Sequence, residues 1–144
     1  MQDTQKNLYK EHLRRGEIII LFLSNKYALK NIKNATGYDG ELYAAHYLMK
    51  KRYKLVDARY TGRFGEIDLI VRNKNFIVFV EVKLRKNKNF GTAGEAVTYS
   101  KQQKIVKTAL QWIKTYKCDL QPRFDVVEIY TELGEINHIE NAFA

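Results

Sequence analysis

Residues 76–83 (FIVFVEVK) constrain the fold most, because only Glu81 and Lys83 interrupt an otherwise apolar run. Aromatic and β-branched residues dominate the run, and the polar turn Asn-Lys-Asn at 73–75 precedes it, which predicts a strand over 76–84. Side chains alternate between the two faces of a strand. One face is then wholly apolar (Phe76, Val78, Val80, Val82, Leu84), and the other becomes ionic only at its end (Ile77, Phe79, Glu81, Lys83).

Two further strand-like runs precede this one, near 54–61 and 65–72, and Gly62 marks the turn between them. Runs joined by such short turns predict an antiparallel meander. On the second strand we expect Ile67, Leu69 and Val71 to form the apolar side.

Helical spacing of apolar residues appears on both sides of the meander. The first helix is predicted from Asp39, as N-cap, to about Arg52, with Glu41 in its first turn and a buried stripe of Leu42, Ala45, Tyr47 and Leu48. The second is predicted over 95–117, with Val97, Ile105, Ala109, Ile113 and Tyr116 on one face. A strand at 123–130 and a short one at 136–139 follow.

The predicted order is therefore helix, three strands, helix, strand. A helix that crosses from the third strand to the fourth makes their pairing parallel. The expected fold class is α/β, with a mixed sheet flanked by helices.

The length of 144 residues and a hydrophobic content of 45% favour one domain with a real core. We assign this domain to 37–144 and a basic helical extension to 1–36. The run 18–23 is too short to span a bilayer, no secretory signal is evident, and the single Cys118 fits a reducing cytoplasm. The apolar run 18–23 could instead be buried in the interface of a homodimer, and the sequence leaves this possibility open.

The formal charge of +9 comes from 25 Lys and Arg against 16 Asp and Glu, and it is spread over the chain. Such an excess favours a polyanionic partner, nucleic acid before a membrane surface, because each neutralised phosphate releases counterions.

Charges gather where the second and third strands of the meander meet. A turn centred on Lys74 and Asn75 puts Asp68 opposite Glu81 and Glu66 opposite Lys83, although another turn length would shift this register. Neighbouring carboxylates at the edge of a core are costly, and a divalent cation offsets the cost. Carboxylate and carbonyl oxygens suit Mg²⁺. The alternative is a solvated face with cross-strand ion pairs worth ~0.2–1 kcal/mol each.

Six motifs, in order, resemble the YraN-like family of uncharacterised bacterial proteins: GE (40–41), GEIDLI (65–70), FVEVK (79–83), KQ (101–102), RFDVV (123–127) and NAF (141–143). The resemblance covers about 37–144. It implies a restriction endonuclease-like (PD-(D/E)XK) core, related in motif to Holliday junction resolvases.

The resemblance also implies roles for individual residues. Asp68, Glu81 and the carbonyl of Val82 would hold Mg²⁺ or Mn²⁺, Lys83 would position or activate water, and Glu41 would support a second ion. The residues expected to contact nucleic acid are Lys101, Gln102, Arg85, Lys86 and Arg123. Two departures stand out: Ile67 replaces the proline of the motif, and Thr61 stands where the family often has arginine, with Arg59 and Arg63 as neighbouring substitutes.

The leading hypothesis is a metal-dependent nuclease that hydrolyses phosphodiester bonds, in DNA rather than RNA, at branched or unpaired structures. The alternative is a catalytically silent module that binds nucleic acid or a partner on the same fold. For Arg123 and Asp125, a structural ion pair is the alternative to contact with DNA. The tyrosines Tyr43, Tyr47, Tyr53 and Tyr60 are expected to pack in the core and at its rim.

Overall fold

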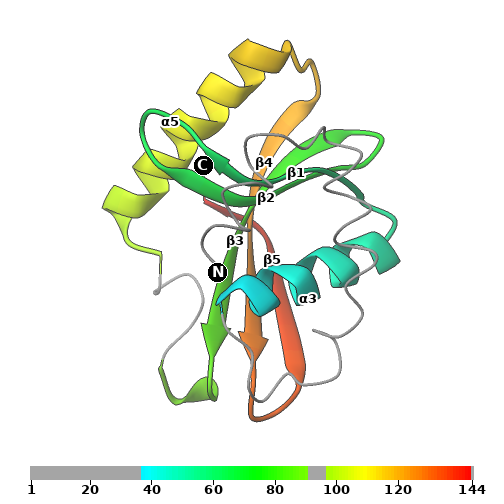
Figure 1. Cartoon of the computed structure of the whole chain (residues 1–144), viewed down its shortest axis with the longest axis vertical. Coiled ribbons are helices and arrows are strands. Elements are labelled where there is room, and N and C mark those ends of the chain that lie inside the picture. The colour runs from blue at the N-terminus through cyan, green and yellow to red at the C-terminus, as the bar shows by residue number, and fades with distance from the viewer. Residues whose placement is uncertain (1–36, 91–96, 144) are drawn as a thin grey trace, which may run out of the picture.

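A computed structural model of the chain describes residues 37–90 and 97–143 (Figure 1). The predicted extension 1–36 and the run 18–23 lie outside these residues. The elements are α3 (Gly37–Lys50), β1 (Lys54–Thr61), β2 (Glu66–Arg72), β3 (Phe76–Arg85), the 3₁₀ helix η3 (Lys88–Phe90), α5 (Tyr99–Tyr116), β4 (Gln121–Tyr130) and β5 (Glu135–Phe143).

The five strands form one mixed sheet in the order β1-β2-β3-β4-β5. β1, β2 and β3 pair antiparallel, β3 and β4 pair parallel across the α5 crossover, and β5 returns antiparallel to β4. The predicted meander, crossover helix and parallel fourth strand are confirmed. β5 is longer than the predicted 136–139, because Phe143 at its end stacks on Phe124 of β4 with ring centroids 5.4 Å apart.

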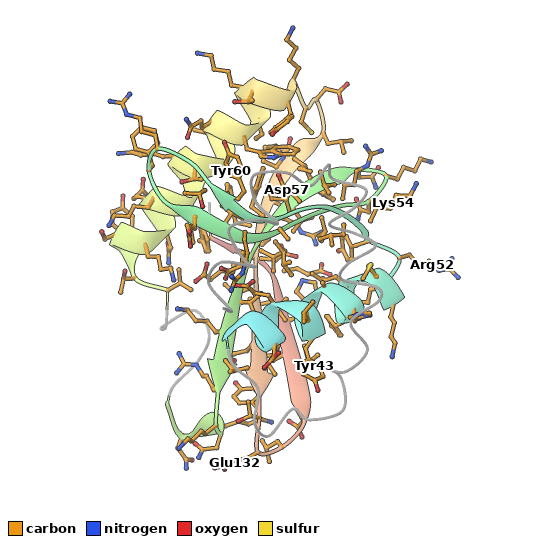
Figure 2. All side chains as sticks on the ribbon, viewed as in Figure 1. Tyr43, Arg52, Lys54, Asp57, Tyr60 and Glu132 are labelled. Carbon is orange, nitrogen blue, oxygen red and sulfur yellow. The ribbon has the colours of Figure 1, made fainter. Side chains whose placement is uncertain are left out.

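The two helices cover opposite faces of the sheet, so the molecule has three layers (Figure 1). Each face of the sheet carries one apolar cluster: the α3 cluster is formed with Leu42 and Leu48 of α3, and the α5 cluster with Ile105 and Trp112 of α5. Figure 2 labels a tyrosine on each face: Tyr43 of α3 belongs to the α3 cluster, and Tyr60 of β1 packs against the α5 cluster. β3 contributes Val78 and Val80 to the first cluster and Ile77 and Phe79 to the second, as its predicted alternation requires.

Several local expectations are corrected. α3 begins at Gly37, so Asp39 lies in its first turn and is not the N-cap. α5 is capped by Thr98, whose side chain accepts a hydrogen bond from the amide of Lys101. The buried side chains of α5 include Trp112, whereas Tyr116 is exposed.

The alternation of β2 breaks at Asp68. Leu69 and Val71 pack in the α3 cluster as predicted, but Ile67 packs with Ile70 in the α5 cluster, so its predicted side is wrong. On β1, Arg59 stands between Ala58, which pairs with Leu69, and Tyr60, which pairs with Ile67, and its φ of 52° is in the left-handed region. A strict two-residue repeat is therefore lost at the start of β2, where the acidic motif lies.

α3 approaches the sheet closely at Gly40. A Cβ there would lie 3.1 Å from a methyl of Leu84 and 3.8 Å from a methyl of Val82. The missing side chain lets the first half of α3 rest on the end of β3, which brings the next residue, Glu41, toward the charged end of that strand.

A fully buried carboxylate, Asp125, ties β4 to β5. It accepts hydrogen bonds from Arg123 at 2.8 and 2.9 Å, from His138 Nε2 at 2.7 Å and from the amide of Asn141 at 3.0 Å. Arg123 also donates to the Tyr53 hydroxyl at 2.6 Å. Burial by itself would raise the pKa of Asp125, but these donors lower it below its ordinary value.

We expect Asp125→Asn to destabilise the fold by about 3 kcal/mol, because it leaves the Arg123 guanidinium buried without its counterion. Chemical denaturation measures the change. Asp119→Asn, at an exposed aspartate in the α5–β4 connection, is the matched control and should change little. Equal stability of the two variants would contradict a structural role for the Asp125 network.

Candidate functional site

Glu81 is the centre of a charged cluster on the α5 side of the sheet. Glu81 lies near the end of β3 and is only 5% exposed. Two ammonium groups approach its Oε1 atom. Lys101, in the first turn of α5, contacts this atom directly, and Lys83 of the same strand lies 3.6 Å away. The Thr98 cap fixes the start of α5 and thereby the position of Lys101.

Asp68 lies beside Glu81 on the neighbouring strand. The regular β2–β3 ladder has the predicted register, from Arg72 with Ile77 to Leu69 with Val80. Beyond it, the Asp68 carboxylate accepts a hydrogen bond from the amide of Val82 at 2.8 Å. The side chain thus takes over a backbone donor of β3 and lies at the Glu81 end of that strand.

The third carboxylate, Glu41, comes from α3 on the other face of the sheet and is mostly buried. Arg59 of β1 holds it through two hydrogen bonds, of 2.5 and 3.4 Å. Arg59 is one of the two arginines expected to substitute for the residue missing at Thr61. The left-handed backbone at Arg59 accompanies this contact between the sheet and the helix.

The sequence predicted that Glu66 would belong to the charged cluster, but it does not. It is exposed and accepts a hydrogen bond from the Thr61 hydroxyl at 3.0 Å, while Lys83 approaches Glu81. Of the four charged residues that the sequence placed together, three lie at this end of β3: Asp68, Glu81 and Lys83. Two residues of the helices join them, Lys101 from α5 and Glu41 from α3.

The pKa shifts follow from this crowding. Burial, the charge of Glu81 and the charge of Glu41 raise the pKa of Asp68 to about 7, against the opposing hydrogen bond from Val82. Burial and the neighbouring Lys101 ammonium lower the pKa of Lys83. Burial is the largest single influence on Lys101 and acts in the same direction, but the hydrogen bond and charge of Glu81, together with Lys83 and Asp68, outweigh it and raise the pKa of Lys101.

The donor set at this point consists of oxygen atoms. Asp68 and Glu81 supply carboxylates, and β3 supplies the carbonyl of Val82 between Glu81 and Lys83, which fits a hard divalent cation. Within 37–90 and 97–143, however, no three His, Cys, Asp or Glu side chains are arranged so that they could hold a metal ion. Glu41 is turned to Arg59, and Lys101 contacts Glu81.

The five residues expected to contact nucleic acid differ in their surroundings. Lys101 contacts Glu81, and Gln102 donates to the carbonyl of Val97 at 2.9 Å. Arg85 lies 3.1 Å from the fully buried carboxylate of Glu128, and Arg123 is buried against Asp125, the structural pair that the sequence left as the alternative. Lys86 is exposed.

The sequence named Arg59 only as a substitute for the residue missing at Thr61 and did not predict its contact with Glu41, which lies 18 residues away along the chain. The buried carboxylate of Glu128 was missed altogether. Glu128 lies in an otherwise largely apolar strand and is fully buried. The structure shows its partners there, the guanidinium of Arg85 and the hydroxyl of Tyr130. The bond to Glu128 raises the pKa of Tyr130 to about 12.

Fold and site together define a small α/β domain with a mixed five-stranded sheet and a cluster of carboxylates and ammonium groups on the adjacent strands β2 and β3. The profile of the Uncharacterised protein family UPF0102 matches residues 40–129. The chain belongs to this family.

Individual relatives carry the same family name. The UPF0102 protein of Caldanaerobacter subterraneus subsp. tengcongensis is 49% identical over 117 residues, which cover 77% of this chain and 96% of the relative. UPF0102 proteins of Thermodesulfovibrio yellowstonii and Vibrio parahaemolyticus are 45% and 41% identical, over 74% and 78% of this chain and 94% of each relative. The resemblance seen in the motifs is thus confirmed at the level of the family.

None of the described helices has the length and the apolar character that crossing a bilayer requires.

Asp68→Asn tests the crowding of the carboxylates. Because the folded protein holds the Asp68 proton more tightly than the unfolded chain, the parent loses stability as the pH rises from about 4 to about 7. The variant lacks this loss, so its free energy of unfolding relative to the parent should improve by about 2–3 kcal/mol between about pH 5 and about pH 8.

Denaturation at the two pH values measures this difference. Glu66→Gln removes an exposed carboxylate from the same strand and is the matched control; its difference from the parent should change less with pH than that of Asp68→Asn. A pH-independent difference for Asp68→Asn would mean that the pKa of Asp68 is not raised.

Proposed function

We propose that the protein is a metal-dependent nuclease that hydrolyses phosphodiester bonds in DNA, at branched or otherwise structured sites. One observation carries the proposal: carboxylates from two adjacent strands, Asp68 and Glu81, meet beside the ammonium group of Lys83. Burial and the neighbouring carboxylates raise the pKa of Asp68 to about 7, whereas the cation-partnered Asp125 has a lowered pKa. Strongly perturbed acids in such a setting are typical of functional sites.

In this proposal Asp68, Glu81 and the Val82 carbonyl would bind Mg²⁺ or Mn²⁺. When bound, the divalent cation would supply Lewis acid stabilisation of the charge that develops on the phosphate oxygens. Glu41 lies close enough to raise the pKa of Asp68 and would support a second ion once released from Arg59.

The two lysines would have different tasks. Lys83 has a lowered pKa, so its neutral form is more accessible than that of an ordinary lysine, and it would position or deprotonate the attacking water. Lys101 has a raised pKa and remains an ammonium. It would neutralise Glu81 in the metal-free protein and turn to the substrate phosphate when a cation takes over Glu81.

A catalytically silent module that binds nucleic acid is the second candidate. The contact between Lys101 and Glu81 favours it, because an ammonium group then balances the carboxylate without a metal. This candidate predicts affinity for DNA that a chelator does not change, and no cleavage with any divalent cation. In both candidates the protein acts in the cytoplasm, which its single free cysteine, Cys118, supports.

Incubation of the full chain with labelled linear, nicked and branched DNA in Mg²⁺ or Mn²⁺ tests the proposal. The parent should cleave at least one substrate, and Asp68→Asn and Glu81→Gln should lower the rate by at least about a hundredfold, because each removes a charge from the metal site. Gel electrophoresis of the products measures the rates.

Glu66→Gln is the matched control, since it removes an exposed carboxylate two residues from Asp68 and should keep the parental rate. Cleavage that persists in both site variants would assign the activity to another site or a contaminant. Parent protein that binds DNA but cleaves no substrate would favour the silent module.

A further inference from the structure

The turn between β1 and β2 lies against α5 (Figure 1). A hydrogen bond of 2.8 Å from the amide of Gly62 to the carbonyl of Gly65 closes the turn, and the amide of Arg63 donates to the Gln111 side chain at 2.9 Å. A Cβ at Gly62 would lie 2.6 Å from Gln111 Oε1 and 3.1 Å from a methyl of Thr108. Turn and helix therefore form one continuous surface.

Phe64 at the tip of this turn is 44% exposed. The Lys107 ammonium lies 5.6 Å from the centre of its ring, and the Arg63 guanidinium lies 5.8 Å from it. Both distances fall within the range of cation–π contacts, which orient cations around an aromatic face.

Large apolar side chains are concentrated on this side of the described structure. Those exposed are Phe64, Tyr99, Leu110, Tyr116 and Leu133, and all but Leu133 lie on α5 or on the turn against it. Aromatic residues and arginine are enriched at binding interfaces, so the exposed Phe64 between Arg63 and Lys107 is a candidate contact residue for a partner.

The charge of α5 has one sign. From Tyr99 to Tyr116 the helix contains Lys101, Lys104, Lys107 and Lys114 and neither Asp nor Glu. Residues three apart are neighbours on a helix surface, so the first three lysines follow one another along its side. The side chain of Lys104 lies 3.9 Å from the Cβ position of Gly65, so this row runs from the Glu81 cluster to the turn.

We propose that Arg63, Phe64, Lys104 and Lys107, the turn–helix surface, bind an unpaired segment of a nucleic acid strand. A base would stack on Phe64, and the adjoining phosphates would lie on Lys104 and Lys107. The inference deepens the proposed function and rests on it, because the row of lysines continues to the candidate nuclease site.

The chemistry of the surface selects the partner. Basic residues attract any polyanion, but an exposed ring adds affinity only for a planar group whose face is free. A base in a continuous duplex is stacked on both sides, whereas an unpaired base has a free face, and its stacking on an aromatic residue strengthens binding on the order of tenfold. Phe64 therefore discriminates between unpaired and paired strands, and the lysines do not.

Fluorescence anisotropy of the full chain in the presence of a chelator tests this surface without any cleavage. The probes are a labelled single-stranded oligonucleotide and the same strand in a complete duplex. Phe64→Leu keeps an apolar side chain but loses the aromatic face, so it should weaken binding of the single strand about tenfold and leave duplex binding nearly unchanged. Phe64→Tyr keeps the ring and should bind both probes as the parent does.

Two further variants separate stacking from charge. Lys107→Gln should weaken binding of both probes and reduce the dependence of the affinity on salt concentration. Leu133→Ala, at the exposed apolar residue in the β4–β5 turn, should change neither.

Phe64→Leu that binds single strands as the parent does, or that loses the same factor on both probes, would overturn the assignment of a stacked base. A parent that binds neither probe would overturn the surface altogether. The proposed function fails separately: selective binding without cleavage in Mg²⁺ or Mn²⁺ leaves the surface intact, and cleavage that is insensitive to Phe64→Leu refutes the surface alone.

Discussion

The need to neutralise buried carboxylates governs this domain. A sheet covered by helices on both faces leaves little water around its central strands, and an ionised acid there is costly unless donors or cations surround it. Asp125 and Glu128 on β4 are fully buried and have such partners in Arg123, His138 and Arg85. These contacts join β4 to its neighbours β3 and β5. They thereby stabilise β3, the strand that carries Glu81 and Lys83 of the site.

The site itself departs from that arrangement. Asp68 has two carboxylates near it and a backbone amide as its hydrogen-bond donor, so its pKa moves up, while that of Asp125 moves down. Both residues are aspartates on inner strands of one sheet. The difference arises from the sign of the neighbouring charges, and it identifies Asp68 as the acid for which the fold supplies less charge compensation.

Local backbone geometry brings the members of the site together. The absence of a side chain at Gly40 lets α3 approach β3, and the left-handed conformation of Arg59 accompanies its bond to Glu41. The same turn that follows β1 seats Phe64 against α5, one helical row of lysines away from Glu81. The site and the turn–helix surface thus share the elements β1, β2 and α5, while β3 and α3 contribute to the site alone.

The sequence by itself determined the order of the elements, the meander, the β2–β3 register and the two faces of β3. These follow from interactions near in the chain: apolar periodicity, turn residues at 73–75 and the two-residue repeat of strands. It also selected Asp68, Glu81 and Lys83, since residues on paired strands meet once the register is known.

Only the tertiary structure decided which charge meets which. The pairing of Arg59 with Glu41, the contact of Lys101 with Glu81 and the burial of Glu128 depend on how α3 and α5 dock on the sheet, and no local pattern encodes that docking. The side of Ile67 was mispredicted for the same reason, because the strand repeat breaks where β1 turns an arginine toward a helix. Long charged side chains reach partners over several ångströms, so their contacts follow from packing and not from position in the sequence.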